Sequence, residues 1–391
     1  MTLGQDVRRL TAFQSSADLD LDTFVAICAQ ALDPATVPTA ASIDQTVPIY
    51  EASALWSAAA DDPRVIMAEL NGCLLDGPGA FAVRGLVDPS VVDDATTIYR
   101  EIIAAERASG LTTGDHFAAP GSNDRLWNSF QKLAEHAPET FTAYFANPVL
   151  DLICQAWLGP AYRMTAQVNV VHPGGAAQRP HRDYHLGFLP DADAARYPIP
   201  VHQASALLTL QGAVAHSDMP VESGPTRLLP FSHQYPLGFM AYRDPRFEEH
   251  FAEHFVQIPL RRGDGLFFNP ALFHAAGDNR TTDVARMANL MQVSSAFGKP
   301  METIDTAATT ITCYPNLQAL HSEQGFSAAV EALMTMVADG YPFPANVDRT
   351  PPLGGLAPAS QRDLLRQALA EHWPTDHLQA ALTQQIADRR A

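Results

Sequence analysis

Between Tyr162 and about residue 300 the chain is a succession of short segments rich in β-forming residues, and this feature limits the fold more than any other. Gly, Pro and Asp separate the segments, as turn residues separate strands. The segments read MTAQVNVV, SALLTLQGAV, TRLLPF, HFVQIPL, GDGLFFN and ARMANLMQVSSAF. Several short strands with turns between them predict a β-sandwich or a β-barrel.

Helical patterns lie on both sides of this β-rich part. Apolar residues follow helical spacing in DLDLDTFVAICAQAL and again over residues 138–158. A short strand at residues 80–83 precedes a long helix, which we expect to begin at Pro89 with Asp88 as its N-cap. After about residue 300 the strands give way to helices around a Pro-rich loop.

These patterns divide the chain into three expected parts. They are an N-terminal helical extension (1–64), a β core with its packing helices (65–299) and a C-terminal helical extension (300–391). The last part is longer than a β core needs. We expect it to pack over the core or to form a homodimer contact, and a solvated helical appendage is the equally weighted alternative.

Charge and composition exclude several classes of partner. Asp and Glu number 43 against 25 Lys and Arg, which gives a formal net charge of −18. Nucleic acids and anionic membranes attract clustered positive charge, so we expect neither as a partner.

No apolar run approaches the length of about 18 residues that a membrane span needs. The first residues carry charges where a secretory leader would be apolar. Four scattered cysteines without a CxxC pair predict no disulfide framework, and we expect a cytoplasmic protein.

The stretch QRPHRDYHLGF contains a His-x-Asp pair, His181 and Asp183. On a strand, residues two apart share one face. A third ligand, His274, follows the strand-like run GDGLFF and a turn. Two imidazoles and one carboxylate can occupy one face of an octahedron and leave three positions open, as in non-heme Fe(II) oxygenases. In a chain with 14 histidines the His-x-Asp pair alone is weak evidence, and the distant His274 strengthens it.

Arg286 lies twelve residues after His274, at the start of another strand-like run. A guanidinium at this place can bind a carboxylate through two parallel hydrogen bonds. Taken alone, Arg286 would be interpreted as half of a surface salt bridge. Arg280, in the GDNR turn, is the competing arginine, and its place in a turn predicts exposure to solvent.

In sequence order, NGCLLDGPGAFAVRGLVDPSVVDD, HPGG, HRDYHLGF, ESGPTRLLPFSHQ and RRGDGLFFNPALFHAAGDNR resemble the phytanoyl-CoA dioxygenase family of Fe(II)/2-oxoglutarate-dependent oxygenases. The resemblance covers roughly residues 65 to 298. It implies a double-stranded β-helix, also called a jelly roll and similar to the cupins, with flanking helices. It also implies that His181, Asp183 and His274 bind Fe(II) and that Arg286 binds the far carboxylate of 2-oxoglutarate. The implied reaction uses O2 to hydroxylate a C–H bond of a small molecule, while 2-oxoglutarate becomes succinate and CO2.

The chain departs from the family pattern at three positions. Phe231 stands where the PGSH turn usually has Gly, and Ser223 replaces the Asn of NGP. Ala276, two residues after His274, replaces a Ser that often helps to hold the 2-oxoglutarate carboxylate. Another polar group must then complete that site, and the candidates are Thr209, Gln211, Gln167 and Asn169. Alternation places each pair on one strand face, but leaves open whether that face meets the metal or solvent.

Residues next to the proposed ligands are candidates for substrate contact. His185 shares the face of Asp183 if the strand continues, so we expect His185 and Tyr184 to touch substrate, with hydrogen bonding around the metal as the alternative. Arg182 fits an inward role near the co-substrate or a plain salt bridge. Trp127 is expected in a lid or pocket.

Two other functions compete with a hydroxylase. A halogenase or other oxidase variant of the same fold is one, but a halogenase replaces the ligand carboxylate by a small residue, and Asp183 is present. A non-catalytic metal-binding jelly roll, acting as a scaffold or sensor, needs neither three open metal positions nor Arg286. The identity of the substrate is open. An acyl-CoA would need a basic patch, and Arg261–Arg262 is the only adjacent basic pair near the expected core.

Overall fold

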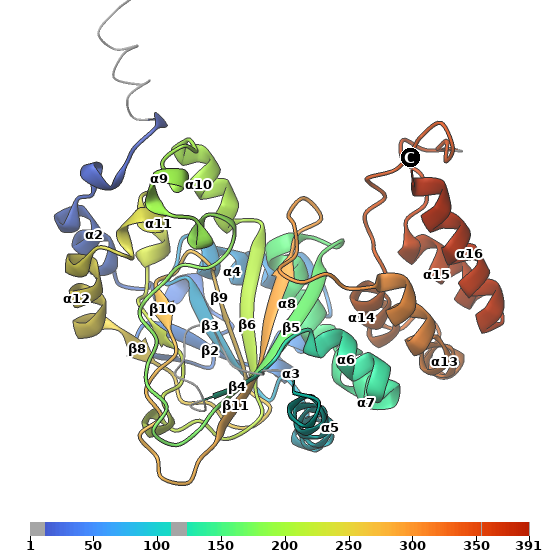
Figure 1. Ribbon diagram of the computed structural model, residues 1–391, viewed down its shortest axis with the longest axis horizontal. Coiled ribbons are helices and arrows are strands. Elements are labelled where there is room, and N and C mark those ends of the chain that lie inside the picture. Colours follow the sequence, from blue (N-terminus) through green and yellow to red (C-terminus); the bar gives the residue numbers. More distant parts are fainter. Residues whose placement is uncertain (1–11, 111–122, 353, 391) are drawn as a thin grey trace, which may run out of the picture.

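The computed structural model describes residues 12–110, 123–352 and 354–390, which fold around two facing β-sheets (Figure 1). In these ranges the larger sheet has the order β1-β2-β3-β9-β6-β11-β5-β4, and the smaller sheet has the order β10-β7-β8. The larger sheet comprises β1 (Ser42–Asp44), β2 (Val47–Glu51), β3 (Ala80–Arg84), β9 (Gly265–Phe268), β6 (Thr209–Ala215), β11 (Arg286–Ser294), β5 (Arg163–Val171) and β4 (Asn123–Leu126). The smaller sheet comprises β10 (His274–Ala275), β7 (Arg227–Leu228) and β8 (Val256–Gln257). The predicted β core of jelly-roll type is confirmed.

Helices cover the outer face of the larger sheet, where they pack against β2, β3, β4, β5 and β6. They are α3 (Ala52–Ala58), α4 (Pro63–Leu75), α5 (Pro89–Ala108), α6 (Ser129–His136), α7 (Pro138–Phe145) and α8 (Pro148–Leu158). A second group lies on the side of the smaller sheet (Figure 1). Its members are α2 (Leu21–Cys28), α9 (Asp191–Ala194), α10 (Ile199–Ala206), α11 (Gly238–Ala241) and α12 (Pro245–His254).

Local sequence signals set where several of these helices begin. α5 begins at Pro89, and the Asp88 side chain accepts a hydrogen bond from the Ser90 N–H at 2.8 Å, as predicted. α8 begins at Pro148 in the same way, with Asn147 as its N-cap. Proline is favoured at the first helical position because its missing N–H would have no partner there.

The expected N-terminal helical extension is partly wrong, because residues 42–51 form β1 and β2. β2 joins the main sheet parallel to β3, with Ile49 opposite Ala82. Val47 and Tyr50 are fully buried in this sheet. Burial of these side chains between neighbouring elements outweighs the helical tendency of the surrounding Ala-rich sequence.

The sequence also predicts no membrane span, no disulfide framework and no secretory leader. No helix in the described ranges combines the length and the apolar character that a bilayer-spanning helix needs. All four cysteines lie in those ranges and are free thiols. The first eleven residues, on which the expectation about a leader rests, lie outside them.

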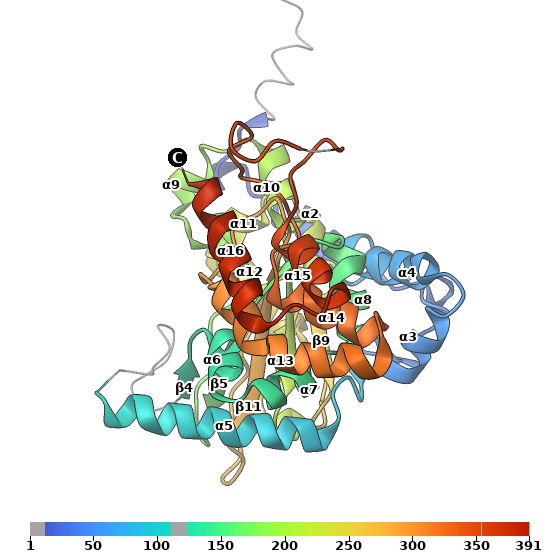
Figure 2. The ribbon, with the colours of Figure 1, turned by 90° about the vertical axis from the view of Figure 1, so that its right-hand side faces the viewer.

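The C-terminal helices lie at one side of the barrel in Figure 1, and this side faces the viewer in Figure 2. They are α13 (Thr306–Gln324), α14 (Ala328–Val337), α15 (Gln361–Ala370) and α16 (Thr375–Arg389). α13 contacts α6 and α7, and α14 contacts α8. Tyr314 and Leu333 belong to the same buried cluster as Phe130 and Phe141 from the core helices. The tail is therefore part of the packed structure, and a homodimer contact through it stays a prediction.

Deletion from Pro342 onward should destabilise the protein. It removes α15 and α16, whose Leu365, Leu369, Leu378 and Leu382 are buried. Each buried leucine contributes roughly 1.5–3 kcal/mol, so we expect the thermal unfolding midpoint to fall by about 10 °C or more, or the protein to aggregate. Circular dichroism melting and size-exclusion chromatography measure this. A soluble truncation with an unchanged midpoint would show that the tail is only an appendage.

Candidate metal centre and its cavity

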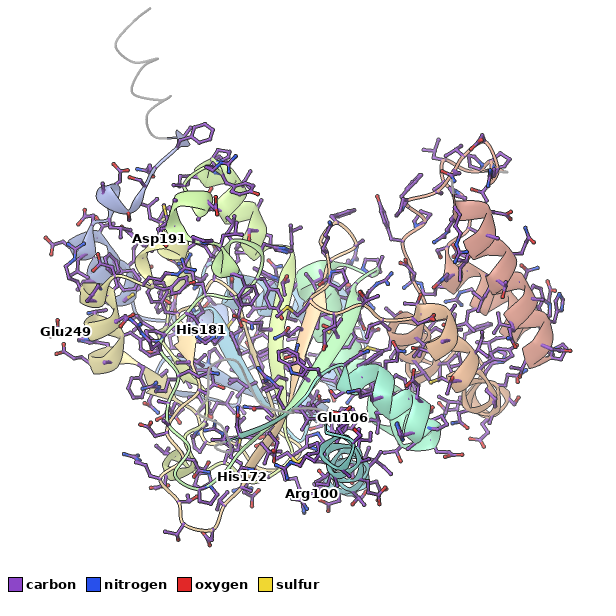
Figure 3. All side chains as sticks on the ribbon, in the orientation of Figure 1. Arg100, Glu106, His172, His181, Asp191 and Glu249 are labelled. Atoms are coloured by element: carbon purple, nitrogen blue, oxygen red, sulfur yellow. The ribbon has the colours of Figure 1, made fainter. Side chains whose placement is uncertain are left out.

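His181, Asp183 and His274 lie close together, and Figure 3 shows His181 in the left half of the molecule, over the β-rich part. His181 and His274 form an isolated antiparallel bridge, with N–H to carbonyl distances of 3.0 and 3.1 Å. The Asp183 N–H donates to the Pro270 carbonyl at 3.1 Å. β9 ends at Phe268 and the following turn delivers His274 on β10, as the sequence predicts. Main-chain hydrogen bonds thus hold all three residues.

The three side chains offer ligand atoms that lie within 4.8 Å of one another. Nε2 of His274 lies 3.4 Å from Oδ2 of Asp183, and Nε2 of His181 lies 3.7 Å from Oδ1. Ligands about 2.1 Å from one ion, on adjacent octahedral positions, lie about 3 Å apart. Small side-chain movements would therefore complete an octahedral face, and the donor set of two imidazoles and one carboxylate fits Fe(II).

Hydrogen bonds fix both imidazoles in the form that binds metal. Nδ1 of His181 donates to the Arg179 carbonyl at 2.9 Å, and Nδ1 of His274 donates to the Leu272 carbonyl at 2.8 Å. Because a carbonyl only accepts, the proton sits on Nδ1, and Nε2 is the ring atom that can bind a metal ion.

The carboxylate of Asp183 is held in a similar way. Nε2 of Gln211 donates to its Oδ2 at 2.5 Å. Burial raises the pKa of Asp183, but the nearby His181 and His274 and the Gln211 hydrogen bond outweigh burial and hold that pKa well below its usual range. The group is therefore an anionic ligand at neutral pH.

Asp183 and His185 do not share a strand face, so that prediction is wrong. The chain turns after Asp183, because Tyr184 and His185 have φ values of 66° and 45°, and His185–Phe188 form a short 3₁₀ helix. Tyr184 is only 3% exposed, and neither Tyr184 nor His185 is among the residues that line the cavity described next. Their expected contact with substrate gains no support from these positions.

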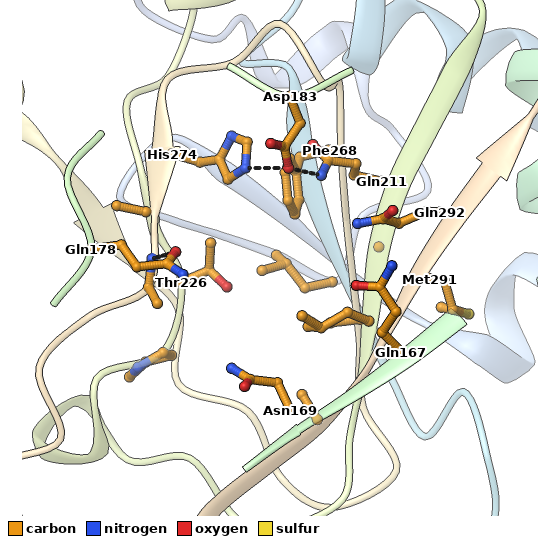
Figure 4. Close-up of a pocket in the computed structure, with 18 of the residues that line it drawn as sticks. Gln167, Asn169, Gln178, Asp183, Gln211, Thr226, Phe268, His274, Met291 and Gln292 are labelled. Atoms are coloured by element: carbon orange, nitrogen blue, oxygen red, sulfur yellow. Dashed lines mark hydrogen bonds and ion pairs between the residues drawn. The ribbon is translucent and has the colours of Figure 1, made fainter. Parts of the chain in front are cut away.

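A cavity of about 500 Å³ adjoins the metal-ligand set (Figure 4). Alternate residues of three neighbouring strands line it: Gln167 and Asn169 on β5, Gln211 and Ala213 on β6, and Arg286, Ala288, Leu290 and Gln292 on β11. The candidate face of β5 and β6 therefore points into the barrel. Thr209 is the exception, since it is fully buried but does not line the cavity.

Arg286 is a buried cation at the wall of this cavity. It is 7% exposed, and its Nη1 donates to the carbonyls of Ser223 and Gly277 at 2.7 and 3.2 Å. In the described ranges no carboxylate forms an ion pair with it, and burial lowers its pKa to about 10. A buried charge without a counter-charge is costly, so an anionic ligand is the natural partner. The residue after Ser223, Gly224, cannot carry a side chain, because a Cβ there would lie 2.3 Å from the Asp278 carbonyl oxygen.

The other two candidate arginines, Arg182 and Arg280, do not line this cavity. Arg182 points away from the cavity and donates to the carbonyls of Ser232 and Tyr235 at 2.5 and 3.1 Å, so neither predicted role applies. Its burial lowers its pKa to about 9. Arg280 is exposed, as its place in a turn predicts.

The cavity has lining residues that the sequence did not single out. Among its lining residues in the described ranges, Thr226 is the one serine or threonine, and Figure 4 shows it beside Gln178. Its position in ESGPTR, directly before β7, is a signal that could have found it. Met301 and Glu302 come from an irregular segment between β11 and α13 that carries no pattern. Trp127 lines the cavity as expected.

Comparison with known proteins agrees with this architecture. The profile of the family described as "Phytanoyl-CoA dioxygenase (PhyH)" matches residues 75–288. Among curated proteins, "Dioxygenase trt7" of Aspergillus terreus is 28% identical over 149 residues. That alignment covers 38% of this chain and 46% of the relative, so less than half of the relative is spanned.

Solved structures with a similar arrangement include two proteins of low sequence identity. The non-heme alpha ketoglutarate dependent epimerase SnoN from nogalamycin biosynthesis has a TM-score of 0.42 and 20% identity, over 59% of this chain and 82% of its own. HygX from Streptomyces hygroscopicus, with nickel and 2-oxoglutarate bound, has a TM-score of 0.39 and 15% identity, over 59% and 89%. The family profile matches more than half of the 391 residues, and the chain therefore belongs to the phytanoyl-CoA dioxygenase family.

Proposed function

We propose that this protein is an Fe(II)/2-oxoglutarate-dependent oxygenase that hydroxylates a C–H bond of a small molecule. One observation supports the proposal most strongly: one cavity is lined both by the two-His, one-Asp ligand set and by a buried arginine that has no carboxylate partner in the described part of the chain. A structural metal site would need no such cation. Membership of the family supports the same activity.

Each residue has a separate task in this proposal. His181, Asp183 and His274 hold the ion, and Gln211 keeps the Asp183 carboxylate in place. Arg286 orients 2-oxoglutarate by its far carboxylate, as a guanidinium binds a carboxylate in a planar two-point contact. Iron with 2-oxoglutarate supplies the activation of O2 and the oxidation of the C–H bond, with release of succinate and CO2. Leu266, Phe268 and Leu290 line the cavity and exclude water from the reaction.

Thr226 is the hydroxyl that we expect to compensate for Ala276 in holding the co-substrate carboxylate. A hydrogen bond to a charged group contributes about 1.5–3 kcal/mol, so Thr226→Val should weaken 2-oxoglutarate binding about tenfold to 100-fold. Iron binding should not change. Anaerobic calorimetric titration measures both, with Thr383→Val on the exposed face of α16 as the control. Equal affinity in wild type and Thr226→Val would show that another group completes the site.

The proposed activity is tested by O2-dependent conversion of 2-oxoglutarate to succinate. Purified protein with Fe(II) should form succinate, and a library of small molecules should stimulate the rate when one is the substrate. The Asp183→Ala variant is the background control. A protein that binds Fe(II) but neither binds 2-oxoglutarate nor forms succinate would instead be the metal-binding scaffold. Chlorinated product formed in the presence of chloride would identify a halogenase.

A further inference from the structure

Three glutamines gather at the metal end of the cavity. Gln292 on β11 lies directly opposite Gln211 on β6, and Gln167 on β5 lies opposite Leu290. Arg286 is six residues from Gln292 along β11, which is about 20 Å at about 3.3 Å per residue. Gln292 is therefore remote from the co-substrate clamp along the backbone, and Gln167, opposite Leu290, is about 13 Å along β11 from Arg286. Figure 4 shows their side chains next to one another, with Gln211 bonded to Asp183.

Glu302 lines the same cavity from the segment that follows β11. Its Oε1 accepts a hydrogen bond from the Asn128 main-chain N–H at 2.6 Å, which fixes the carboxylate. Its Oε2 is buried and has no hydrogen-bond partner within 3.5 Å among the described residues. The residue lies outside the part of the chain that matches the family profile, residues 75–288. It is therefore a feature of this chain beyond the shared core.

Other polar atoms at this end are also buried without partners. They include Oε1 of Gln292 and both amide atoms of Gln167. Burial raises the pKa of Glu302, and the Gln167 amide acts on its carboxylate as a hydrogen-bond donor that lowers this pKa. This contact is nevertheless too long or too bent for an ordinary hydrogen bond. Buried polar atoms are normally paired, so unpaired acceptors that line a cavity indicate the donors of a ligand.

We propose that Gln167, Gln292 and Glu302 form the substrate-recognition site, and that this site takes a small molecule bearing hydroxyl or amino groups rather than a carboxylate or phosphate. The inference rests on the proposed oxygenase function and names its substrate class. A buried carboxylate accepts hydrogen bonds and repels anions. The Cζ of Arg125 lies 5.1 Å from the Trp127 ring centroid, and both Arg125 and Lys132 interact favourably with the Glu302 carboxylate.

Two residues that line the cavity are apolar and exposed to solvent. Phe188 and Met301 line the cavity and are 48% and 37% exposed, so their apolar surfaces are available to a hydrocarbon part of the ligand. The expected substrate therefore joins an apolar frame to hydrogen-bond donors.

The test uses the full chain loaded with 2-oxoglutarate and with Zn(II) as a redox-inert substitute for Fe(II). Three probes share one ring: cyclohexylamine, cyclohexanol and cyclohexanecarboxylate. Binding is followed by saturation-transfer NMR. We expect the affinity for the amine and for the alcohol to be at least about tenfold higher than the affinity for the carboxylate.

Variants locate the interaction. Glu302→Gln keeps an acceptor for the Asn128 N–H, yet replaces the unpaired oxygen by a donor, so cyclohexylamine should bind about tenfold more weakly. Gln292→Leu should weaken cyclohexanol binding in the same way. The matched controls Glu323→Gln and Gln384→Leu, exposed on α13 and α16, should bind the probes as the wild type does. The thermal midpoint of each variant is measured in parallel.

The outcomes separate this inference from the proposed function. A wild type that binds 2-oxoglutarate but prefers the carboxylate probe, or binds neither the amine nor the alcohol, contradicts the recognition site alone. Unchanged probe affinity in folded Glu302→Gln and Gln292→Leu variants also contradicts the recognition site alone. A wild type that fails to bind 2-oxoglutarate contradicts the oxygenase function, and with it the role of this end as a substrate site.

Discussion

Replacing Asp183 by alanine should abolish iron binding and the turnover of 2-oxoglutarate. The change leaves His181 and His274 as the only ligands of the set, and two imidazoles hold Fe(II) poorly at a site that needs three contacts. Loss of residues that merely support metal ligands already costs about 10- to 100-fold in affinity, so loss of a ligand should cost more than about 100-fold. Iron content after desalting and succinate formation measure the effect.

The same result is expected for His181→Ala and His274→Ala. His136→Ala is the matched control, because His136 is exposed at the end of α6, away from the cavity. A His274→Ala protein with full iron content and activity would show that the third ligand lies elsewhere. An equal loss in the His136 variant would point to unfolding instead of ligand loss.

Replacing Arg286 by alanine should weaken 2-oxoglutarate binding and leave iron binding intact. The far carboxylate of the co-substrate would lie in a buried site and lose its charged partner. Removing one member of a buried charge pair costs about 2–5 kcal/mol, which is roughly 30- to several-thousand-fold in affinity. Arg286→Lys should recover only part of the lost 2-oxoglutarate affinity, because an ammonium cannot form the planar two-point contact. Anaerobic titration of 2-oxoglutarate into Fe(II)-loaded protein gives the affinities.

Arg280→Ala provides the control for this substitution. Arg280 is close in sequence to Arg286 but is exposed, so its removal should leave the 2-oxoglutarate affinity unchanged. The clamp has been assigned to the wrong arginine if the Arg280 variant loses affinity and the Arg286 variant does not.

The parts of the site that could be predicted from the sequence have local signals. His181 and Asp183 share one short motif, and His274 follows a strand and turn that are visible in GDGLFF and the residues after it. Arg286 stands at the start of β11, where the β-rich pattern placed it. The resemblance to a known family added the jelly roll and joined these pieces into one site.

The other features depend on contacts between distant segments, which local patterns do not contain. β2 forms because β3 offers an edge for it, although the surrounding sequence favours helix. The positive φ values of Tyr184 and His185 redirect the chain and end the expected strand. Glu302 reaches the cavity because its irregular segment is tied to the Asn128 N–H, which no spacing reveals.

Diffraction at the iron edge from crystals grown anaerobically with Fe(II) and 2-oxoglutarate would test the metal ligands and Arg286 together. We expect one anomalous peak about 2.0–2.2 Å from Nε2 of His181, Nε2 of His274 and a carboxylate oxygen of Asp183, with the far carboxylate of 2-oxoglutarate on Arg286. A metal peak away from these three residues, or a 2-oxoglutarate carboxylate bound to another cation, would contradict this expectation.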